Sequence, residues 1–323
     1  MNKFGFYEHL TKDFPSQVMI DVTEYCDLAC IHCPHPTFVK SEHFKGTFLE
    51  VDLHNKAIDE IKKDGLKSCR YVRYTSNGEP LIHKNLSKMI EYTSNIIPEV
   101  STNLTTNAKL LDSKKAIEIL KTGIDVIDIS IDAFNEDTYS KIRVKGDLNV
   151  TRPNVLNLIN QKNKMNTPTK IIVSYVEQEL NKNETDQFEE FWKKNGADFV
   201  AVRRIHSCAG SKEEKRIEMI ENQKVKKSFR KPCLYPWERL IIAPNGFLSF
   251  CPADWKYGSK FVDFRDTTIK VAWNSHFMES LRNAHLSNNF SCHSFCGQCP
   301  DWEATKWPNE GRSYANIMHE MSS

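Results

Sequence analysis

The sequence predicts an α/β fold, a partial (β/α)6 barrel with a small C-terminal domain built on a β-hairpin. Between residues 17 and about 205, short β-rich runs alternate with longer amphipathic stretches, a pattern typical of βα units around a parallel sheet. Six units are too few for a closed eight-unit barrel, so we expect an open one. After residue 232, one clear hairpin stands in a loop-rich segment.

The elements of the barrel follow one another in a regular order. We expect strands at 17–22, 70–74, 100–104, 126–131, 170–176 and 199–203. The run at 126–131 is almost continuously apolar, as a strand buried on both faces should be. Amphipathic stretches predict helices at 52–63, 86–94, 113–121, 153–164 and 184–194. Parallel βα folds place active sites at the C-terminal ends of their strands, so the loops there should carry the chemistry.

A charged segment separates the two expected domains. Twelve of the 21 residues at 211–231 are charged, which predicts an exposed helix or linker. We therefore place the barrel domain at 1–210 and the second domain at 232–323.

The second domain contains one hairpin with a recognisable turn. Pro244-Asn245-Gly246 joins the apolar runs 240–243 and 247–250, and Asn and Gly tolerate the positive φ that such a turn needs. The rest is expected to be too small and loop-rich to build its own core. A metal centre should then supply the missing stability.

Composition and charge exclude several classes of protein. The chain has 323 residues, 40% hydrophobic and 27% charged, as in ordinary folded proteins. A net charge of +2 argues against nucleic-acid binding through bulk positive charge. No apolar run approaches the roughly 18 residues of a membrane span, and the N-terminus lacks the apolar segment of a secretory signal. We expect a cytoplasmic protein, in which ten cysteines indicate metal or redox chemistry.

Three cysteines follow the first expected strand in the pattern Cys26-x3-Cys30-x2-Cys33. Three thiolates on one short loop can bind one metal centre. Structural zinc sites and closed [4Fe–4S] clusters take four protein ligands, so three leave one position open for a substrate. A zinc site completed by His32 or His35 is the alternative.

This loop resembles the cysteine motif of the radical S-adenosylmethionine (SAM) superfamily. The resemblance implies a [4Fe–4S] cluster whose open iron chelates the amino and carboxylate groups of SAM. One electron then cleaves SAM into methionine and a 5′-deoxyadenosyl radical, which abstracts a substrate hydrogen. It also implies a flavodoxin or ferredoxin-type reductant. His32 stands where many members have an aromatic residue that helps to hold the adenine, and histidine can stack similarly.

The same resemblance implies a set of SAM-binding residues. Ser76-Asn77-Gly78-Glu79-Pro80 is similar to the family's Gly-Gly-Glu-Pro segment, whose carbonyls and carboxylate face the methionine amino group. The expected SAM-binding residues are His32, Asn77, Gly78, Glu79, Pro80, Asn107, Ser130, Asp132 and Arg143. From the residues alone, 77–80 is only a turn, and Asn107 and Asp132 fit helix N-caps or turns equally well.

Five further cysteines lie in the second domain, two flanking the hairpin turn and three in Cys292-x3-Cys296-x2-Cys299. The arrangement resembles the auxiliary Fe–S domains of radical SAM proteins, and five cysteines fit the shorter twitch form of the SPASM domain. We expect one auxiliary [4Fe–4S] cluster bound by Cys233, Cys251, Cys296 and Cys299. Cys292 would be free, close to the ligands or an alternative ligand, and His293 an exposed loop residue. A zinc site with four cysteine ligands is the alternative.

Other residues are assigned on weaker grounds. Cys69 and Cys208 stand alone and are expected to be structural. The substrate should sit between the open barrel end and the second domain. The candidates for catalytic residues are Arg203, Arg204 and His206, and those for other lining residues are Tyr175, Trp237, Glu238 and Asp254. Each of these also fits a surface residue without a role.

We expect an oxidoreductase that dehydrogenates a hydroxylated small molecule such as a sugar or cyclitol, because the chain resembles twitch-domain dehydrogenases of an aminocyclitol. The alternative is a peptide- or protein-modifying maturase that forms a cross-link, an epimer or a formylglycine-type oxidation. Many such maturases have an N-terminal winged-helix-like domain, and the 25 residues before Cys26 leave no room for one. An Fe–S electron carrier is a third alternative, but a carrier needs no SAM site.

Overall fold

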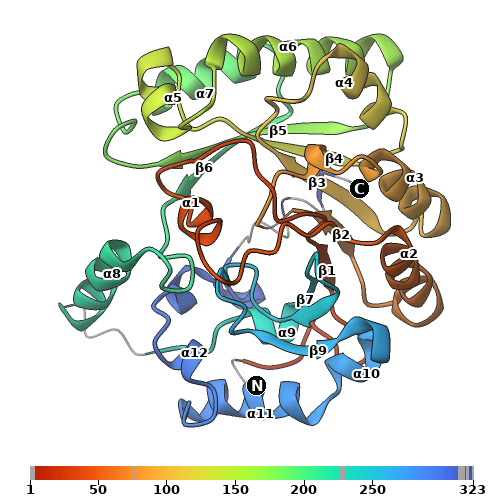
Figure 1. Cartoon of the computed structure of the whole chain (residues 1–323), viewed down its shortest axis with the longest axis vertical. Helices are drawn as coiled ribbons and strands as arrows, with labels where there is room; N and C mark the ends of the chain where they lie inside the picture. Colours follow the sequence, from red (N-terminus) through yellow and green to blue (C-terminus); the bar gives the residue numbers. More distant parts are fainter. Residues whose placement is uncertain (1–3, 76, 226–229, 312–316, 318–319, 322–323) are drawn as a thin grey trace.

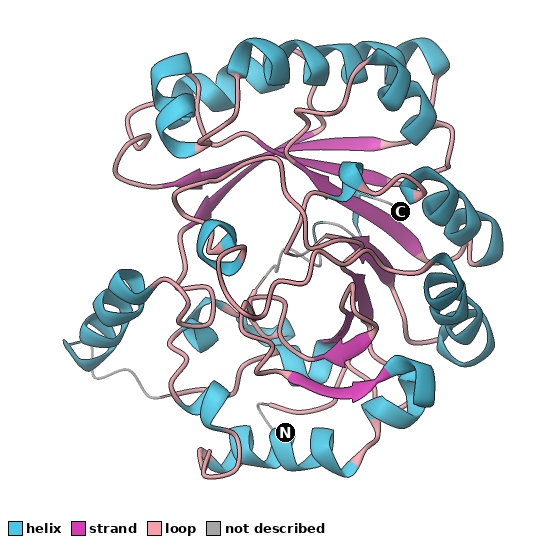
Figure 2. Cartoon of the chain, in the orientation of Figure 1, coloured by secondary structure: helices cyan, strands magenta, loops and turns pink. Residues whose placement is uncertain are grey.

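The computed structural model describes residues 4–75, 77–225, 230–311, 317 and 320–321. Their strands form one nine-stranded sheet in the order β6-β5-β4-β3-β2-β1-β7-β8-β9, with β6 and β9 at its edges. The strands are β1 (Gln17–Ile20), β2 (Tyr71–Tyr74), β3 (Ser101–Thr106), β4 (Val126–Ser130), β5 (Lys170–Glu177), β6 (Phe199–Arg204), β7 (Arg239–Ile242), β8 (Phe247–Ser249) and β9 (Lys260–Asp263). The predicted open, partial barrel is confirmed, and Figure 2 shows its curved sheet.

Helices of the barrel cover the convex side of the sheet, and the short α1 (His35–Phe38) lies on its concave side (Figure 1). The covering helices are α2 (Val51–Glu60), α3 (Leu86–Ile96), α4 (Ser113–Leu120), α5 (Glu136–Ile142), α6 (Leu148–Met165) and α7 (Thr185–Lys194). Each of the β strands from β1 to β6 pairs in parallel with its neighbours, as βα units require.

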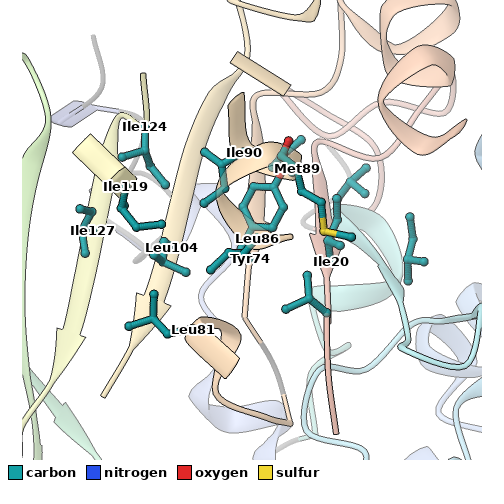
Figure 3. Packing of buried hydrophobic residues seen from close by; sticks show 14 of the residues in the cluster. Ile20, Tyr74, Leu81, Leu86, Met89, Ile90, Leu104, Ile119, Ile124 and Ile127 are labelled. Carbon is teal, nitrogen blue, oxygen red and sulfur yellow. Dashed lines mark hydrogen bonds between the residues drawn. The ribbon is translucent and has the colours of Figure 1, made fainter. Parts of the chain in front are cut away.

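Side chains alternate along each strand, so that one face of the sheet packs into the core and the other forms the concave inner face. Tyr74 on β2, Leu104 on β3 and Ile127 on β4 are fully buried and pack beside the helices, as Figure 3 shows. Their neighbours in sequence, such as Arg73 and Asp128, point to the other face of the sheet, because side chains alternate along a strand. The concave face is therefore polar, and it is there that a site can form.

The hairpin of the C-terminal region extends the barrel's own sheet. β7 pairs in parallel with β1, from Gln17 opposite Arg239 to Ile20 opposite Ile242. β8 pairs antiparallel with β7 and with β9. The turn between β7 and β8 contains Gly246 at φ +85°, the conformation that its sequence predicts.

The expectation that this region is too small to have a core is wrong. Phe264, Trp273, Met278 and Leu281 are fully buried in the same apolar cluster as Ile20 of the barrel. They belong to a segment with four helices, α9 (Tyr235–Glu238), α10 (Ile269–Trp273), α11 (His276–Ser287) and α12 (Ser294–Gly297). The two regions share a core because their strands share a sheet.

Several helices differ from the sequence prediction or extend it. α6 begins at Leu148, five residues early, because Asp147 accepts a hydrogen bond from the backbone N–H of Asn149 at 2.8 Å and caps it. The helices that were not predicted are α1, α5, α9, α10, α11 and α12. The charged segment forms α8 (Glu213–Val225), which buries no residue, while residues 226–229 lie outside the described part. No described helix is long and apolar enough to cross a membrane.

Candidate SAM and iron–sulfur site

The first cysteine loop follows β1 and is held by backbone hydrogen bonds. Ala29 donates to the carbonyl of Val144 at 2.8 Å, and Ile31 donates to that of Ile142 at 3.0 Å. Cys30 lies between these anchors, with Cys26 before them and Cys33 after them; the three thiols are free, and all three line one cavity of about 700 Å³. The loop thus offers three thiols to one space at the C-terminal end of the barrel.

Burial keeps these thiols protonated when no metal is bound. It raises the pKa of Cys26 to about 12 and raises the pKa values of Cys30 and Cys33 as well. For Cys30, the nearby guanidinium of Arg143 partly offsets the rise in pKa that burial causes. Nη1 of Arg143 donates to the Cys30 sulfur at 3.6 Å. Metal binding must therefore release protons from this loop.

Most of the expected SAM-binding residues face the same cavity. It is lined by His32, Asn77, Gly78, Glu79, Asn107, Ser130 and Arg143. Pro80 and Asp132 do not line it, and Ser76 lies outside the described residues. Most of them follow β1 to β4, at the edge where parallel folds bind ligands, whereas Arg143 lies at the end of α5.

Asp132 acts behind the cavity wall as the partner of two cavity residues. Its carboxylate lies 2.5 Å from the Arg143 guanidinium and 3.5 Å from Nε2 of His32, and it is fully buried. Burial lowers the pKa of His32 to about 4, so His32 is neutral and the ion pair is that between Asp132 and Arg143. Asp132 is not a helix cap, because its other oxygen accepts from the backbone N–H of Val176.

The loop after β2 is fixed against the cysteine loop. Gly78 is needed there, since a Cβ would lie 2.1 Å from the carbonyl oxygen of Thr23. Glu79 donates its backbone N–H to Tyr25 at 2.8 Å, and its carboxylate accepts from the backbone N–H of Asn107 at 2.8 Å. Burial raises the pKa of Glu79 to about 7 against the effect of these donors. Asn107 also forms a turn, because its side-chain oxygen accepts from Lys109.

A second, smaller cavity of about 70 Å³ lies in the C-terminal region. All four cysteines predicted to bind the auxiliary cluster line it, namely Cys233, Cys251, Cys296 and Cys299. Cys292 is exposed and does not line it. Among the described residues, no three His, Cys, Asp or Glu side chains converge tightly enough for a single metal ion. The ligands of a four-iron cluster bind different irons, so they need not converge on one point.

Two expectations near this cavity are wrong. His293 is half-buried, and its Nε2 lies 3.0 Å from the hydroxyl of Ser280, so it is not an exposed loop residue. Asp254 is buried and accepts from the backbone and hydroxyl of Ser259, so it stabilises a turn.

The three candidate catalytic residues all line the larger cavity. Arg203 lies 2.6 Å from the buried carboxylate of Asp128, while Arg204 is exposed. The side chain of His206 is half exposed, and its Nδ1 accepts from the backbone N–H of Cys208 at 3.1 Å, so Nδ1 carries no proton in this arrangement. Asp301 lies 3.7 Å from the same nitrogen and raises the pKa of His206.

Of the further candidates, only Glu238 lines the larger cavity, where it pairs with Arg239. Tyr175 is fully buried and its hydroxyl donates to the carbonyl of Asn181. Trp237 packs in a separate apolar cluster. Cys69 is buried as expected, whereas Cys208 reaches the wall of the larger cavity.

The structure adds cavity residues that the sequence did not single out. Arg73 lines the larger cavity, and His285 lines the smaller one. Arg73 alternates with apolar residues in β2, which was the one available signal that it faces away from the core.

Comparison with known proteins decides the family. Residues 20–191 match the radical SAM superfamily, and residues 233–300 match SPASM, an iron–sulfur cluster-binding domain. The chain belongs to the radical SAM superfamily. This radical SAM protein therefore binds a [4Fe–4S] cluster and SAM, its SPASM region implies auxiliary Fe–S binding, and it is an enzyme that needs a reductant and a substrate.

Relatives of the radical SAM protein are similar over only part of their length. It is 34% identical to the GTP 3′,8-cyclase of Clostridium botulinum over 131 residues. This aligned segment covers 40% of this chain and 39% of that protein. The GTP 3′,8-cyclase of Desulforamulus reducens is 30% identical over 132 residues, 40% of this chain and 38% of that protein. The chain thus spans less than half the length of these curated relatives.

Solved structures share the fold over most of the chain. BtrN in complex with AdoMet and 2-DOIA has a TM-score of 0.59 at 15% identity, covering 88% of this chain and 92% of that one. SuiB of Streptococcus suis bound to the precursor peptide SuiA has a TM-score of 0.63 at 14% identity, covering 89% and 71%. At these identities the likeness shows the fold alone.

Replacing Cys26, Cys30 and Cys33 with alanine should reduce the iron content of the anaerobically reconstituted protein from about eight to about four per chain, because each [4Fe–4S] cluster holds four irons. SAM cleavage under dithionite should be abolished. Iron analysis and chromatography of 5′-deoxyadenosine measure both. Persistent SAM cleavage in this variant would rule out the assignment of these ligands.

The double substitution Cys233→Ala with Cys251→Ala should remove about four irons and leave SAM cleavage without substrate intact, since its cavity is separate from the first loop. Cys292→Ala is the matched control and should keep about eight irons, because Cys292 is exposed outside the cavity. Loss of iron in Cys292→Ala but not in Cys299→Ala would contradict the ligand set. Stoichiometric zinc with iron for one cluster only would favour the zinc alternative.

Arg143→Met should lower the free energy of unfolding by about 3–5 kcal/mol, because it leaves the buried Asp132 carboxylate without its guanidinium. Urea denaturation measures the loss. Adding Asp132→Asn should restore part of it, because the unpaired charge is then gone. Equal stabilities of Arg143→Met and the double variant would contradict the assignment of the loss to an unpaired Asp132 charge.

Proposed function

We propose that the enzyme dehydrogenates a hydroxylated small molecule, such as a sugar or cyclitol, converting a carbinol carbon to a carbonyl. One observation carries this proposal. The larger cavity and the cavity with the four C-terminal cysteines share wall residues, which are His206, Tyr235, Ala253 and Ala304. A substrate beside the SAM-binding residues would thus be one layer of side chains from the auxiliary site.

The proposal assigns different tasks to the two sites. When bound, SAM with its cluster supplies a 5′-deoxyadenosyl radical that removes one hydrogen atom, and the auxiliary cluster supplies an acceptor for the remaining electron. The hydroxyl proton must pass to a protein group. The candidate groups are His206, on the wall shared by the two cavities, and Glu238, on the wall of the larger one.

The chain's own residues prepare the cavity for a polar molecule. Thr105 accepts from the Arg73 guanidinium at 3.0 Å, and Arg203 pairs with Asp128, so both arginines are held in place. A cavity of about 700 Å³ is within the usual range of about 300–1,000 Å³ for small-molecule sites, and it must hold SAM as well. This favours a small second substrate. A flavodoxin or ferredoxin-type protein would supply the electron for SAM cleavage.

A nucleotide is the second candidate substrate. The relatives named GTP 3′,8-cyclase favour it, and so do the guanidinium groups of Arg73, Arg203 and Arg204 on the cavity wall, since guanidinium groups bind phosphate well. A peptide substrate is the outcome that would be expected if the enzyme resembled SuiB in activity as well as in fold.

The test asks which molecules stimulate 5′-deoxyadenosine formation. The reduced enzyme is incubated with SAM and with a small-molecule fraction of cell extract, a peptide fraction, or GTP alone. Stimulation by the small-molecule fraction, with a product two mass units lighter and SAM consumed one for one, supports dehydrogenation. In Cys233→Ala/Cys251→Ala, 5′-deoxyadenosine should still form, with little oxidised product. Stimulation only by GTP or only by peptides would overturn the proposal, as would turnover without a mass change.

A further inference from the structure

His285 lines the auxiliary cavity, and its ring is held in one orientation. It lies near the end of α11, is 4% exposed, and shares the cavity with the four cysteines. Its ring meets Phe290 edge-on, with centroids 4.9 Å apart and planes at 87°, and Trp237 at 6.1 Å and 76°. The direction of its two ring nitrogens is therefore set by packing.

One nitrogen of this ring fixes where the proton is. The backbone N–H of Cys233 lies 3.3 Å from Nδ1 of His285, and a backbone N–H can only donate. Nδ1 therefore accepts, and the ring proton is on Nε2. The hydrogen bond also ties the ring to the first cysteine of the predicted ligand set.

The other nitrogen has no partner within the described protein. Nε2 of His285 is buried and hydrogen-bonds to none of the described residues. Buried N–H groups in native proteins almost always have an acceptor, so the missing acceptor should be something that the cavity holds. The sulfur atoms of an Fe–S cluster are such acceptors.

We propose that the Nε2–H group of His285 donates a hydrogen bond to a sulfur of the auxiliary cluster and raises the reduction potential of that cluster. Of the proposed function, this inference assumes only that the auxiliary cluster is bound by Cys233, Cys251, Cys296 and Cys299. A donor at a cluster sulfur stabilises the reduced form, which carries more negative charge, and so favours acceptance of an electron. His285 is thus a positioning residue that acts through the cluster.

Direct ligation by His285 is the competing role. It would require the proton to move from Nε2 to Nδ1, and the bond from the Cys233 N–H to Nδ1 would then be lost. The four thiols that line the cavity already suffice for a closed cluster. The geometry therefore favours a donor over a ligand.

Redox titration followed by electron paramagnetic resonance (EPR) tests the proposal on the full chain. In the Cys26→Ala/Cys30→Ala/Cys33→Ala background, only the auxiliary cluster should give a signal. His285→Leu should shift its potential to a more negative value, and His285→Gln, which keeps an N–H donor, should restore most of the shift. His293→Leu is the matched control and should cause no shift, because its Nε2 contacts Ser280 instead. Equal potentials for all variants would overturn the proposal.

Pulsed EPR of the protein with wild-type His285, labelled with 15N-histidine, adds a readout that needs no substitution of His285. A weak nitrogen coupling that disappears in His285→Gln supports the hydrogen bond, and its absence overturns it. A strong coupling means ligation and also overturns it. Iron content distinguishes failure of the hydrogen-bond proposal from failure of the four-cysteine ligand set. A background variant without iron refutes the four-cysteine assignment itself, whereas a cluster that His285 does not influence refutes only the inference.

Discussion

The parallel pairing of β7 with β1 is the constraint on which the rest of the structure depends. The first cysteine loop leaves the C-terminal end of β1, and α9 with Cys233 before it leads into β7. Their register therefore fixes the position of one cysteine group relative to the other. Buried contacts at the start of the pair hold it, since the Ser16 hydroxyl donates to the carbonyl of Glu238 at 3.1 Å. One sheet thus serves both metal-binding regions.

Paired charges organise the concave face that this sheet creates. Asp132 holds Arg143, Asp128 holds Arg203, and Glu238 holds Arg239, with each carboxylate buried. Buried ion pairs add little net stability compared with apolar packing, but losing one partner is costly. The main effect of these ion pairs is to orient the arginine side chains. Each guanidinium is fixed before any ligand binds, so ligand binding loses less side-chain conformational entropy.

Local patterns made the barrel and its first loop predictable from the sequence. The alternation of strands with amphipathic helices predicted all six parallel strands and five of the helices that cover them, and the Cys-x3-Cys-x2-Cys loop carried the resemblance to the family. The joining of β7 to β1 could not be predicted, because it pairs residues more than 200 positions apart and no local pattern encodes such a pairing. For the same reason the shared core at Trp273 was missed. Single polar residues such as Arg73 and His285 belong to no motif, so only the fold shows which cavity they line.

The setting of the auxiliary cavity explains why polar groups are needed there. Phe250, Phe295 and Trp302 contribute to its wall, which makes much of the lining apolar. An apolar environment disfavours added negative charge, so a cluster enclosed by it would be hard to reduce. Arg230 counters this from the segment before Cys233, because it donates to the carbonyl of Gly297 at 2.8 Å and lies close to the thiols of Cys296 and Cys299. A cation and a neutral donor around one apolar cavity would ease the addition of an electron to a cluster held there, because both stabilise added negative charge.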